Sequence, residues 1–400
     1  MTSQRRMKTA TRLVHAGRDP AAQHGMVNPP VYHASTVLFE SLDALENAAA
    51  NPFRGIYYGR NGTPVQFAFE DAVAELEGAH GAVTTCSGLA AITVALMSVA
   101  ESGTHLLVTD NVYGPTRKLC DGLLAGFGVE TEYFDPTLSA EALEALIRPE
   151  TRALFLEAPG SLTFEIADVP ALSAVARRHG VAVLADNTWA TPLYFDAIGH
   201  GVDISIHAAT KYFVGHADAM LGVINCREAH YPRVKKTAAA MGYCAGPDDI
   251  YLGLRGLRTM GQRLTQHDAS ARRLADWLAD RPEVARVIHP ARADHPQHAL
   301  FMRDFSGASG LFAFVLEPVE RARLAAMVDG LALFGMGFSW GGYESLILPI
   351  NPERMRSATV WEASGPTLRV HVGLEDVDDL IADLEAGFER LAGRASQTAR

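Results

Sequence analysis

Residues 204–220 read ISIHAATKYFVGHADAM, a short apolar segment followed by a single lysine, Lys211, among small residues. The apolar segment is typical of a buried strand. Open α/β folds bind their ligands beyond the carboxyl ends of such strands. We therefore expect Lys211 to lie at a ligand site, where desolvation or a neighbouring cation lowers its pKa and provides a neutral amine. The alternative is an ordinary solvated surface lysine.

The sequence on both sides of this stretch alternates short β-branched or apolar runs with longer segments of helical periodicity. This pattern is typical of a parallel sheet wrapped by helices. The expected strands cover residues 82–86, 105–110, 129–134, 153–159, 181–186, 203–208 and 220–226. The expected helices between them cover residues 88–100, 116–128, 139–149 and 169–180.

A different pattern follows a long helical stretch at about residues 247–280. Further strands are expected at residues 285–290, 310–317, 332–339, 345–350 and 367–374, before a last helix at 376–393. We predict an α/β protein with a mostly parallel sheet in a large domain and a smaller C-terminal α+β domain. The predicted units are an arm at 1–60 that packs on a neighbouring subunit, a large domain at 61–250 and a C-terminal domain at 251–400.

Composition excludes several classes of partner. The net charge of -11 and the pI near 5.7 argue against nucleic acid, which needs clustered Lys and Arg. We expect no membrane segment, since no apolar run reaches the ~18 residues that a spanning helix needs. The N-terminus has early arginines without an apolar run behind them, so we expect no signal peptide. The cysteines are widely spaced and predict neither a disulfide framework nor a metal site: Cys86, Cys120, Cys226 and Cys244. We expect a reducing cytoplasm.

Two further features suggest what Lys211 does. Residues 86–91, CSGLAA, turn from an expected strand straight into a helix, and a helix N-terminus of this kind is a ready phosphate site. Asp186 ends another expected strand, where it is either a turn cap or an anion that holds a proton on a pyridine nitrogen. A lysine, an aspartate and a phosphate site together indicate pyridoxal phosphate.

Tyr113 lies in TDNVYGPT, at a third expected turn from strand to helix. Its ring either stacks on the flat face of the cofactor or packs under a loop, and this feature alone favours neither.

The order of six motifs carries a resemblance over nearly the whole chain, from about residue 15 to the last helix. The motifs are YYGRNGTP, SGLAA, DNVYGPT, EAPGSLTFE, ADNTWATP and SIHAATKYFVGHADAMLG. In this order and spacing they resemble the cysteine and methionine metabolism family of fold-type I pyridoxal phosphate enzymes. Two departures stand out, because many members have serine at the position of Ala208 and GHSD in place of GHAD.

The resemblance implies roles for individual residues. Lys211 becomes the Schiff-base lysine, Asp186 the partner of the pyridine nitrogen, and Tyr113 the stacking ring. The implied phosphate contacts are Gly88, Leu89 and Thr210, with Tyr58 and Arg60 reaching the phosphate of the neighbouring subunit. Active sites shared in this way imply a homo-oligomer, which we expect to be a tetramer built from dimers.

The choice of reaction depends on the substrate pocket. Members of the family eliminate or replace groups at the β or γ carbon of sulfur amino acids. Trp340 and Tyr343 stand where γ-acting relatives usually have leucine and valine, and Ser161 stands where many have asparagine. In these positions the chain is similar to the β-eliminating members, although a core tryptophan remains an alternative for Trp340. We place Ser339 beside Trp340 in the substrate pocket.

Arg369 interrupts an otherwise apolar expected strand, where an arginine is costly unless it meets an anion. Its planar guanidinium matches a carboxylate in two parallel hydrogen bonds, which suits an amino-acid substrate. The resemblance assigns Arg369 to the substrate α-carboxylate, and the alternative is an internal ion pair.

We therefore expect β-elimination of cystathionine to homocysteine, pyruvate and ammonia, with activity also on cystine or other cysteine S-conjugates. The alternatives within the family are a γ-lyase or a γ-synthase. An aminotransferase shares the expected fold, lysine and aspartate, but the YGR and SWGGYES stretches argue against it. A non-catalytic binding protein is the remaining alternative.

Overall fold

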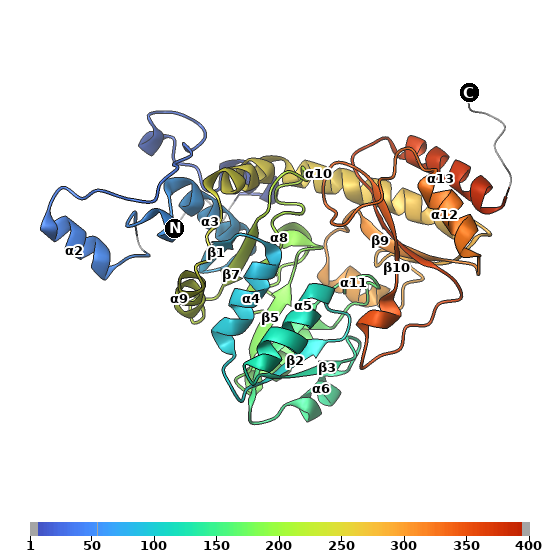
Figure 1. Ribbon diagram of the computed structural model, residues 1–400, viewed down its shortest axis with the longest axis horizontal. Coiled ribbons are helices and arrows are strands. Elements are labelled where there is room, and N and C mark those ends of the chain that lie inside the picture. The colour runs from blue at the N-terminus through green and yellow to red at the C-terminus, as the bar shows by residue number, and fades with distance from the viewer. Residues whose placement is uncertain (1–6, 54, 394–400) are drawn as a thin grey trace.

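A computed structural model describes residues 7–53 and 55–393 of the chain. Figure 1 shows three regions side by side: an N-terminal arm that projects to the left, a central α/β region, and a C-terminal region with its own sheet. The long helix α10, Pro247–Ala279, runs along the central region and continues into the C-terminal one. The boundaries of the three predicted units stay a prediction.

The central sheet has seven strands in the order β1-β7-β6-β5-β4-β2-β3. Its strands are β1 Gly81–Thr85, β2 His105–Thr109, β3 Glu130–Phe134, β4 Thr151–Glu157, β5 Ala182–Asp186, β6 Ile204–His207 and β7 Gly222–Cys226. Strands β6, β5, β4, β2 and β3 are parallel to one another, whereas β7 is antiparallel to both β6 and β1. The predicted, mostly parallel sheet is confirmed.

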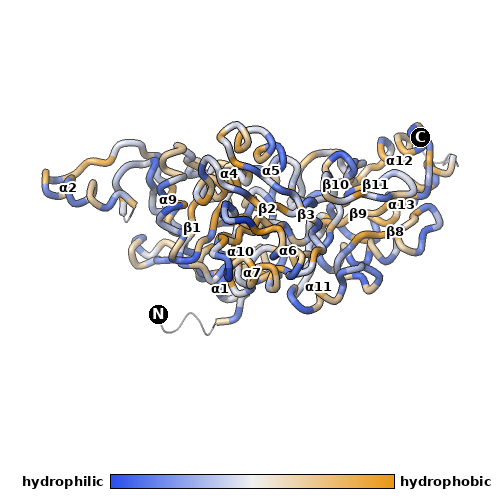
Figure 2. Tube along the Cα trace, turned by 90° about the horizontal axis from the view of Figure 1, so that it is seen from below, coloured by the Kyte–Doolittle hydropathy of each residue, from blue (hydrophilic) through white to orange (hydrophobic). Residues whose placement is uncertain are grey.

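Helices cover this sheet, and the apolar stretches gather between them in the middle of the molecule (Figure 2). The helices of this region are α3 Pro64–Glu77, α4 Gly88–Val99, α5 Gly114–Lys118, α6 Ala140–Leu146, α7 Val169–Arg178, α8 Thr191–Tyr194 and α9 Tyr231–Met241. A π-helical segment at Leu119–Leu124 continues α5. Strands buried on both faces read as near-continuous apolar runs, and β2 and β7 are buried at every position.

The C-terminal sheet has four antiparallel strands in the order β10-β11-β9-β8. They are β8 Val284–Ile288, β9 Leu311–Leu316, β10 Leu346–Ile350 and β11 Thr367–His371. The helices of this region are α11 His298–Asp304, α12 Arg321–Asp329 and α13 Val377–Leu391. The projecting arm contains α2 Leu42–Ala50, whereas α1 Thr9–His15 packs against α10 and α3.

One expected strand is wrong. Residues 332–339 form no strand, and only Gly335 makes an isolated bridge, to Leu346. Gly335 and Gly337 weaken the β pairing there, and Ser339 has a φ of 78° that a strand cannot contain. The segment turns out of the sheet instead and leaves Phe338 92% exposed.

No helix among residues 7–53 and 55–393 is both long and apolar enough to cross a membrane. Helix α10 is long enough, but it carries charged residues along its length.

Candidate active site

Lys211 lies in a turn beyond the carboxyl end of β6, four residues after His207. The turn is fixed by backbone hydrogen bonds from Lys211 N to Ala208 O, 3.0 Å, and from Gly215 N to Lys211 O, 2.7 Å. Asp186 ends the adjacent parallel strand β5. The parallel order of these strands therefore brings the amine and the carboxylate to the same edge of the sheet.

The ε-amine of Lys211 meets two residues of the C-terminal region. Its Nζ donates a hydrogen bond to Ser339 Oγ and lies 4.9 Å from the centre of the Trp340 ring. Desolvation, followed by the positive charge of Arg369, lowers the pKa of Lys211 to about 7, although Asp186 opposes the shift. With this pKa, a substantial fraction of the amine is unprotonated near pH 7, as a nucleophile or general base requires.

A strained loop brings Ser339 and Trp340 to the lysine. Ser339 and Gly341 both have positive φ angles, 78° and 87°. A Cβ at Gly341 would lie 3.1 Å from Lys211 Cα, a tight contact, and the φ of 87° would strain any other residue, so both observations favour glycine here. Arg369 on β11 stabilises the loop, because its Nη2 donates a hydrogen bond to Ser339 O at 3.0 Å. Burial lowers the pKa of Arg369 to about 10.

Thr188 fixes the Asp186 carboxylate through hydrogen bonds to one of its two oxygens. Its Oδ1 accepts hydrogen bonds from Thr188 N, 3.0 Å, and from the Thr188 hydroxyl. Burial raises the pKa of Asp186, while the Thr188 hydrogen bonds and the charges of His207 and Lys211 act in the opposite direction. Among the residues that the structure describes, none donates a hydrogen bond to the second oxygen, Oδ2, so this oxygen can meet a cation.

Tyr113 lies at the N-terminus of α5 with 42% of its surface exposed. Its backbone N–H donates to Glu157 Oε2 at 2.6 Å, and Glu157 pairs in register with Asp186. Desolvation, followed by the charge of Asp186, raises the pKa of Glu157 well above its usual value. Sequence reasoning missed Glu157 and Thr188. Nothing in the sequence pointed clearly to Glu157, because the expected strand extended to Pro159, whereas the observed β4 ends at Glu157.

The predicted phosphate contacts lie where β1 turns into α4. The first N–H groups of a helix have no partner within the helix and are free to bind an anion. A Cβ at Gly88 would lie 2.5 Å from Ala208 Cβ, so the helix start packs directly on the residues before Lys211. Leu89 is 39% exposed there. The Thr210 hydroxyl already bonds to Leu221 N and Leu221 O, 2.9 and 3.2 Å, so it would have to turn to donate to a phosphate.

Two predicted residues lie outside this cluster. Tyr58 and Arg60 are exposed in the arm region, and Arg60 donates to Ala239 O of α9 at 2.9 Å. Among the residues that the structure describes, no hydrogen bond or ion pair joins either one to Lys211, Asp186 or Arg369.

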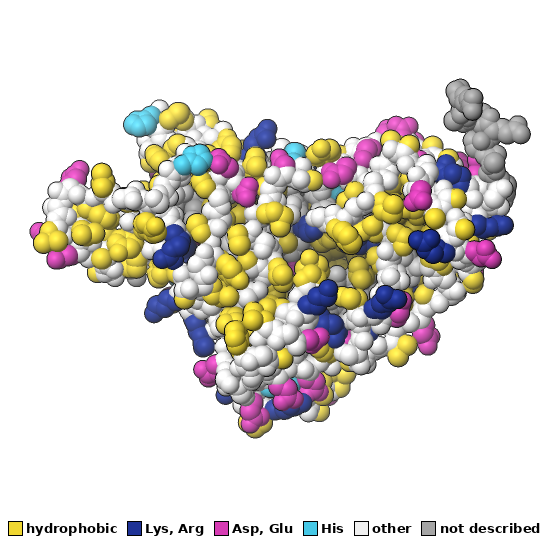
Figure 3. Space-filling model, in the orientation of Figure 1, with side chains coloured by type: hydrophobic (Ala, Val, Ile, Leu, Met, Phe, Trp, Pro, Cys, Tyr) yellow, Lys and Arg dark blue, Asp and Glu magenta, His cyan; other side chains and the backbone are white. Residues whose placement is uncertain are grey.

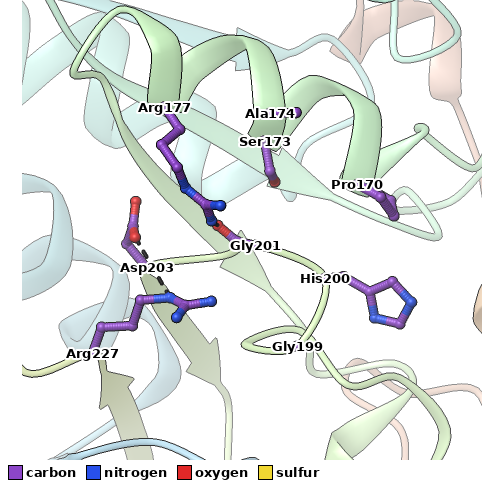
Figure 4. A pocket seen from close by; sticks show the side chains of 9 residues that line it. All are labelled: Pro170, Ser173, Ala174, Arg177, Gly199, His200, Gly201, Asp203 and Arg227. Carbon is purple, nitrogen blue, oxygen red and sulfur yellow. Dashed lines mark hydrogen bonds and ion pairs between the residues drawn. The ribbon is translucent and has the colours of Figure 1, made fainter.

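A separate surface hollow of about 340 Å³ lies between α7 and the loop before β6 (Figure 4). Arg177 and Arg227 line it, but both donate to backbone carbonyls of that loop, at Gly201 and Val202 respectively. Arg227 also pairs with Asp203 at 3.6 Å. These arginines hold the loop in place, so the hollow has no chemistry comparable to that around Lys211.

The fold, the lowered pKa of Lys211 and the carboxylate oxygen of Asp186 that Thr188 does not occupy together fit a site for pyridoxal phosphate. A family model described as Cys/Met metabolism PLP-dependent enzyme matches residues 10–389. The chain is 44% identical to cystathionine beta-lyase MetC of Escherichia coli, over 96% of this chain and 99% of that protein. It is 42% identical to cystathionine beta-lyase of Salmonella typhimurium, over 95% and 98% of the two chains.

A solved structure agrees with these relatives. Cystathionine gamma synthase from Xanthomonas oryzae, in complex with aminoacrylate and cysteine, superposes with a TM-score of 0.88 at 30% identity, covering 97% of this chain and all of that one. The chain belongs to the Cys/Met metabolism PLP-dependent enzyme family. Its cofactor is accordingly pyridoxal phosphate.

The lowered pKa of Lys211 predicts unusual reactivity in the cofactor-free protein. Labelling with an acylating reagent at different pH values, read by mass spectrometry, should show Lys211 reacting with a midpoint near pH 7. Ordinary surface lysines have a pKa of about 10.4 and should still be gaining reactivity at pH 10. A Lys211 profile that follows the surface lysines would contradict the desolvated site.

Proposed function

We propose that the chain is a carbon–sulfur lyase that converts cystathionine to homocysteine, pyruvate and ammonia by β-elimination. The observation that carries this proposal is the direct contact of Lys211 with Ser339 and Trp340. It supports placing Trp340, which distinguishes the chain from γ-acting relatives, at the reacting centre beside Ser339. The β-lyases from E. coli and S. typhimurium support the same reaction.

Lys211 moves the protons in this mechanism. With a pKa near 7 it is partly neutral at physiological pH, so it can accept the proton from the substrate Cα. The ammonium formed in this way can then donate its proton to the departing sulfur. Ser339 Oγ and the face of Trp340 limit where Nζ can move, so the amine is held in a restricted position for both proton transfers.

Asp186 and Tyr113 hold and orient the cofactor. When bound, pyridoxal phosphate supplies a ring that accepts the electron pair left at Cα. The free Oδ2 of Asp186 would hold a proton at the ring nitrogen, and the exposed Tyr113 ring would lie against the face of the cofactor. The start of α4, at Gly88 and Leu89, would hold the phosphate with Thr210.

Arg369 binds the substrate carboxylate. Its Nη2 donates a hydrogen bond to Ser339 O, and the described residues contain no carboxylate that forms an ion pair with Arg369. The alternative of an internal ion pair is therefore not supported. The same guanidinium lowers the pKa of Lys211, so substrate binding and the strength of the base are coupled.

The arm supports assembly with a second copy of the chain. Helix α2 has no buried residue, and apolar side chains gather on the projecting arm in Figure 3. The exposed apolar residues here include Met26, Val27, Tyr32, Leu38, Leu42 and Ile56. Surfaces of this kind mark protein contacts. We propose a cytoplasmic tetramer built from dimers, in which Tyr58 and Arg60 reach the phosphate of the neighbouring subunit.

Product analysis tests the reaction. With cystathionine as substrate, pyruvate and homocysteine should appear in equal amounts, and Lys211→Ala should abolish their formation. Formation of 2-oxobutyrate and cysteine would instead show γ-elimination. A requirement for a 2-oxo acid co-substrate would show an aminotransferase.

Replacing Arg369 tests its partner. Arg369→Ala should raise KM for cystathionine about ten- to a hundredfold. This factor corresponds to the binding free energy lost with one or two charge-assisted hydrogen bonds. The absorbance of the bound cofactor should stay unchanged. Arg286→Ala is the matched control, because Arg286 lies in the same sheet and donates to Glu362 O. Loss of cofactor or unfolding in Arg369→Ala alone would show that Arg369 serves the protein rather than the substrate.

Mixed dimers test the shared site. Arg60→Ala and Lys211→Ala, each almost inactive alone, are unfolded and refolded together. One site of a mixed dimer then carries both changes and the other carries neither. Random pairing should restore about a quarter of the activity of refolded wild type. Mixed dimers without recovered activity would place Arg60 at the site of its own chain.

A further inference from the structure

The loop at 339–342, which meets Lys211, is held by a second side chain of β11. His371 is the last residue of β11 and is 1% exposed. Its Nε2 lies 3.1 Å from Gly341 N and 3.2 Å from Gly342 O. His371 has no part in the mechanism above.

The spacing along β11 explains why two of its side chains reach this loop. Residues two apart in a strand point to the same face of the sheet, so Arg369 and His371 share a face. Arg369 donates to Ser339 O at 3.0 Å. His371 contacts Gly341, two residues further along the loop. The strand therefore holds the loop at two points, one on each side of Trp340.

The imidazole of His371 binds the loop in either neutral tautomer. With the proton on Nδ1, Nε2 accepts a hydrogen bond from Gly341 N. With the proton on Nε2, the same nitrogen donates to Gly342 O. Desolvation by burial lowers the pKa of His371 well below its usual value, so the ring is neutral near pH 7.

The other ring nitrogen shows that packing alone does not explain a histidine at this position. Among the residues that the structure describes, Nδ1 of His371 is buried without a hydrogen-bond partner. A buried polar atom without a partner is destabilising, and an apolar ring of similar size would avoid that cost. What an apolar ring would lose is the hydrogen bond to the loop.

An aromatic contact restricts Trp340 as well. Its ring centre lies 5.5 Å from that of Tyr212, the residue that follows Lys211. Tyr212 is fully buried, and its hydroxyl accepts a hydrogen bond from Gly310 N at 3.0 Å. Trp340 therefore has little freedom once its two neighbours are fixed by β11.

We propose that His371 is a positioning residue that fixes this loop, and through it Nζ of Lys211, for removal of the substrate Cα proton. His371 holds the backbone at Gly341. The two residues before it meet the amine, because Ser339 Oγ accepts its hydrogen bond and the Trp340 ring lies 4.9 Å from Nζ. When the loop is released, the amine is still present but is less often within reach of Cα. This inference rests on the proton-transfer role proposed above for Lys211.

Exchange of the Cα proton of L-alanine for solvent deuterium tests this role. Alanine carries the carboxylate for Arg369 but has no leaving group at Cβ, so its exchange reports proton transfer without elimination. His371→Phe keeps a ring in the core and removes the hydrogen bond to the loop. The exchange rate per bound cofactor, followed by NMR, should fall about ten- to a hundredfold, because a misplacement of about 1 Å can cost on the order of a hundredfold. The dissociation constant of alanine, measured from the absorbance of the bound cofactor, should stay almost unchanged because Arg369 remains on β11.

His371→Gln tests rescue by a side chain that keeps the hydrogen bond. Its amide reaches as far as Nε2 and can accept from Gly341 N or donate to Gly342 O. Most of the wild-type exchange rate should therefore return in His371→Gln.

His267→Phe is the matched control from the same core. His267 is buried, its ring centre lies 5.2 Å from that of His371, and its Nδ1 donates to Val372 O at 2.8 Å. This variant loses a hydrogen bond to the backbone but none to the loop. Its thermal stability should fall while its exchange rate stays at the wild-type value.

The exchange rates decide the outcome. A wild-type rate in His371→Phe, or an equal loss in His267→Phe, would overturn the proposal. If His371→Phe does not fold, His371→Asn replaces it, because its shorter amide does not reach the loop whereas that of His371→Gln does. Equal exchange rates in His371→Asn and His371→Gln would then overturn the proposal.

Lys211→Ala separates this inference from the role of Lys211. If Lys211→Ala still exchanges the alanine proton at the wild-type rate, the proton-transfer role itself fails. If Lys211→Ala loses exchange while His371→Phe does not, only the inference about His371 fails. Formation of 2-oxobutyrate from cystathionine would overturn the proposed β-elimination and would leave the exchange result intact.

Discussion

The site depends on one constraint: the amine of Lys211 is kept largely out of water and next to a second cation. Desolvation and Arg369 together bring its pKa to about 7. The amine can stay there because Asp186 lies on the neighbouring strand end and because Ser339 accepts its hydrogen bond. The central sheet provides the lysine and the aspartate, and the C-terminal region provides the serine and the arginine. Neither part makes the site alone.

The fold was largely predictable because it follows from periodicity. Strands β1 to β7 match apolar runs, and α10 matches a long helical pattern whose acidic first turn is visible in the sequence. The placement of Lys211 and Asp186 was also predictable from the sequence, because the carboxyl ends of parallel strands lie at the same edge of the sheet. Periodicity carries less information in the loop at 338–343. There the conformation is set by contact with Lys211, as the close approach of Gly341 shows.

Partners that connect distant elements were hidden from the sequence. Glu157 accepts a hydrogen bond from the start of α5, and the Thr188 hydroxyl joins Asp186 at the end of β5 to Ala208 beyond β6. A pattern along the chain does not specify such contacts. The shared-site role of Tyr58 and Arg60 depends on a second copy of the chain, so it remains a prediction from resemblance.

The most direct test of the central claim is to identify the lysine that holds the cofactor. The holoenzyme is reduced with borohydride, which fixes the cofactor to the amine that binds it, then digested and analysed by mass spectrometry. The account predicts that the reduced cofactor is attached to the peptide containing Lys211, at that residue. Attachment to any other lysine, or a reduced enzyme without attached cofactor, would contradict it.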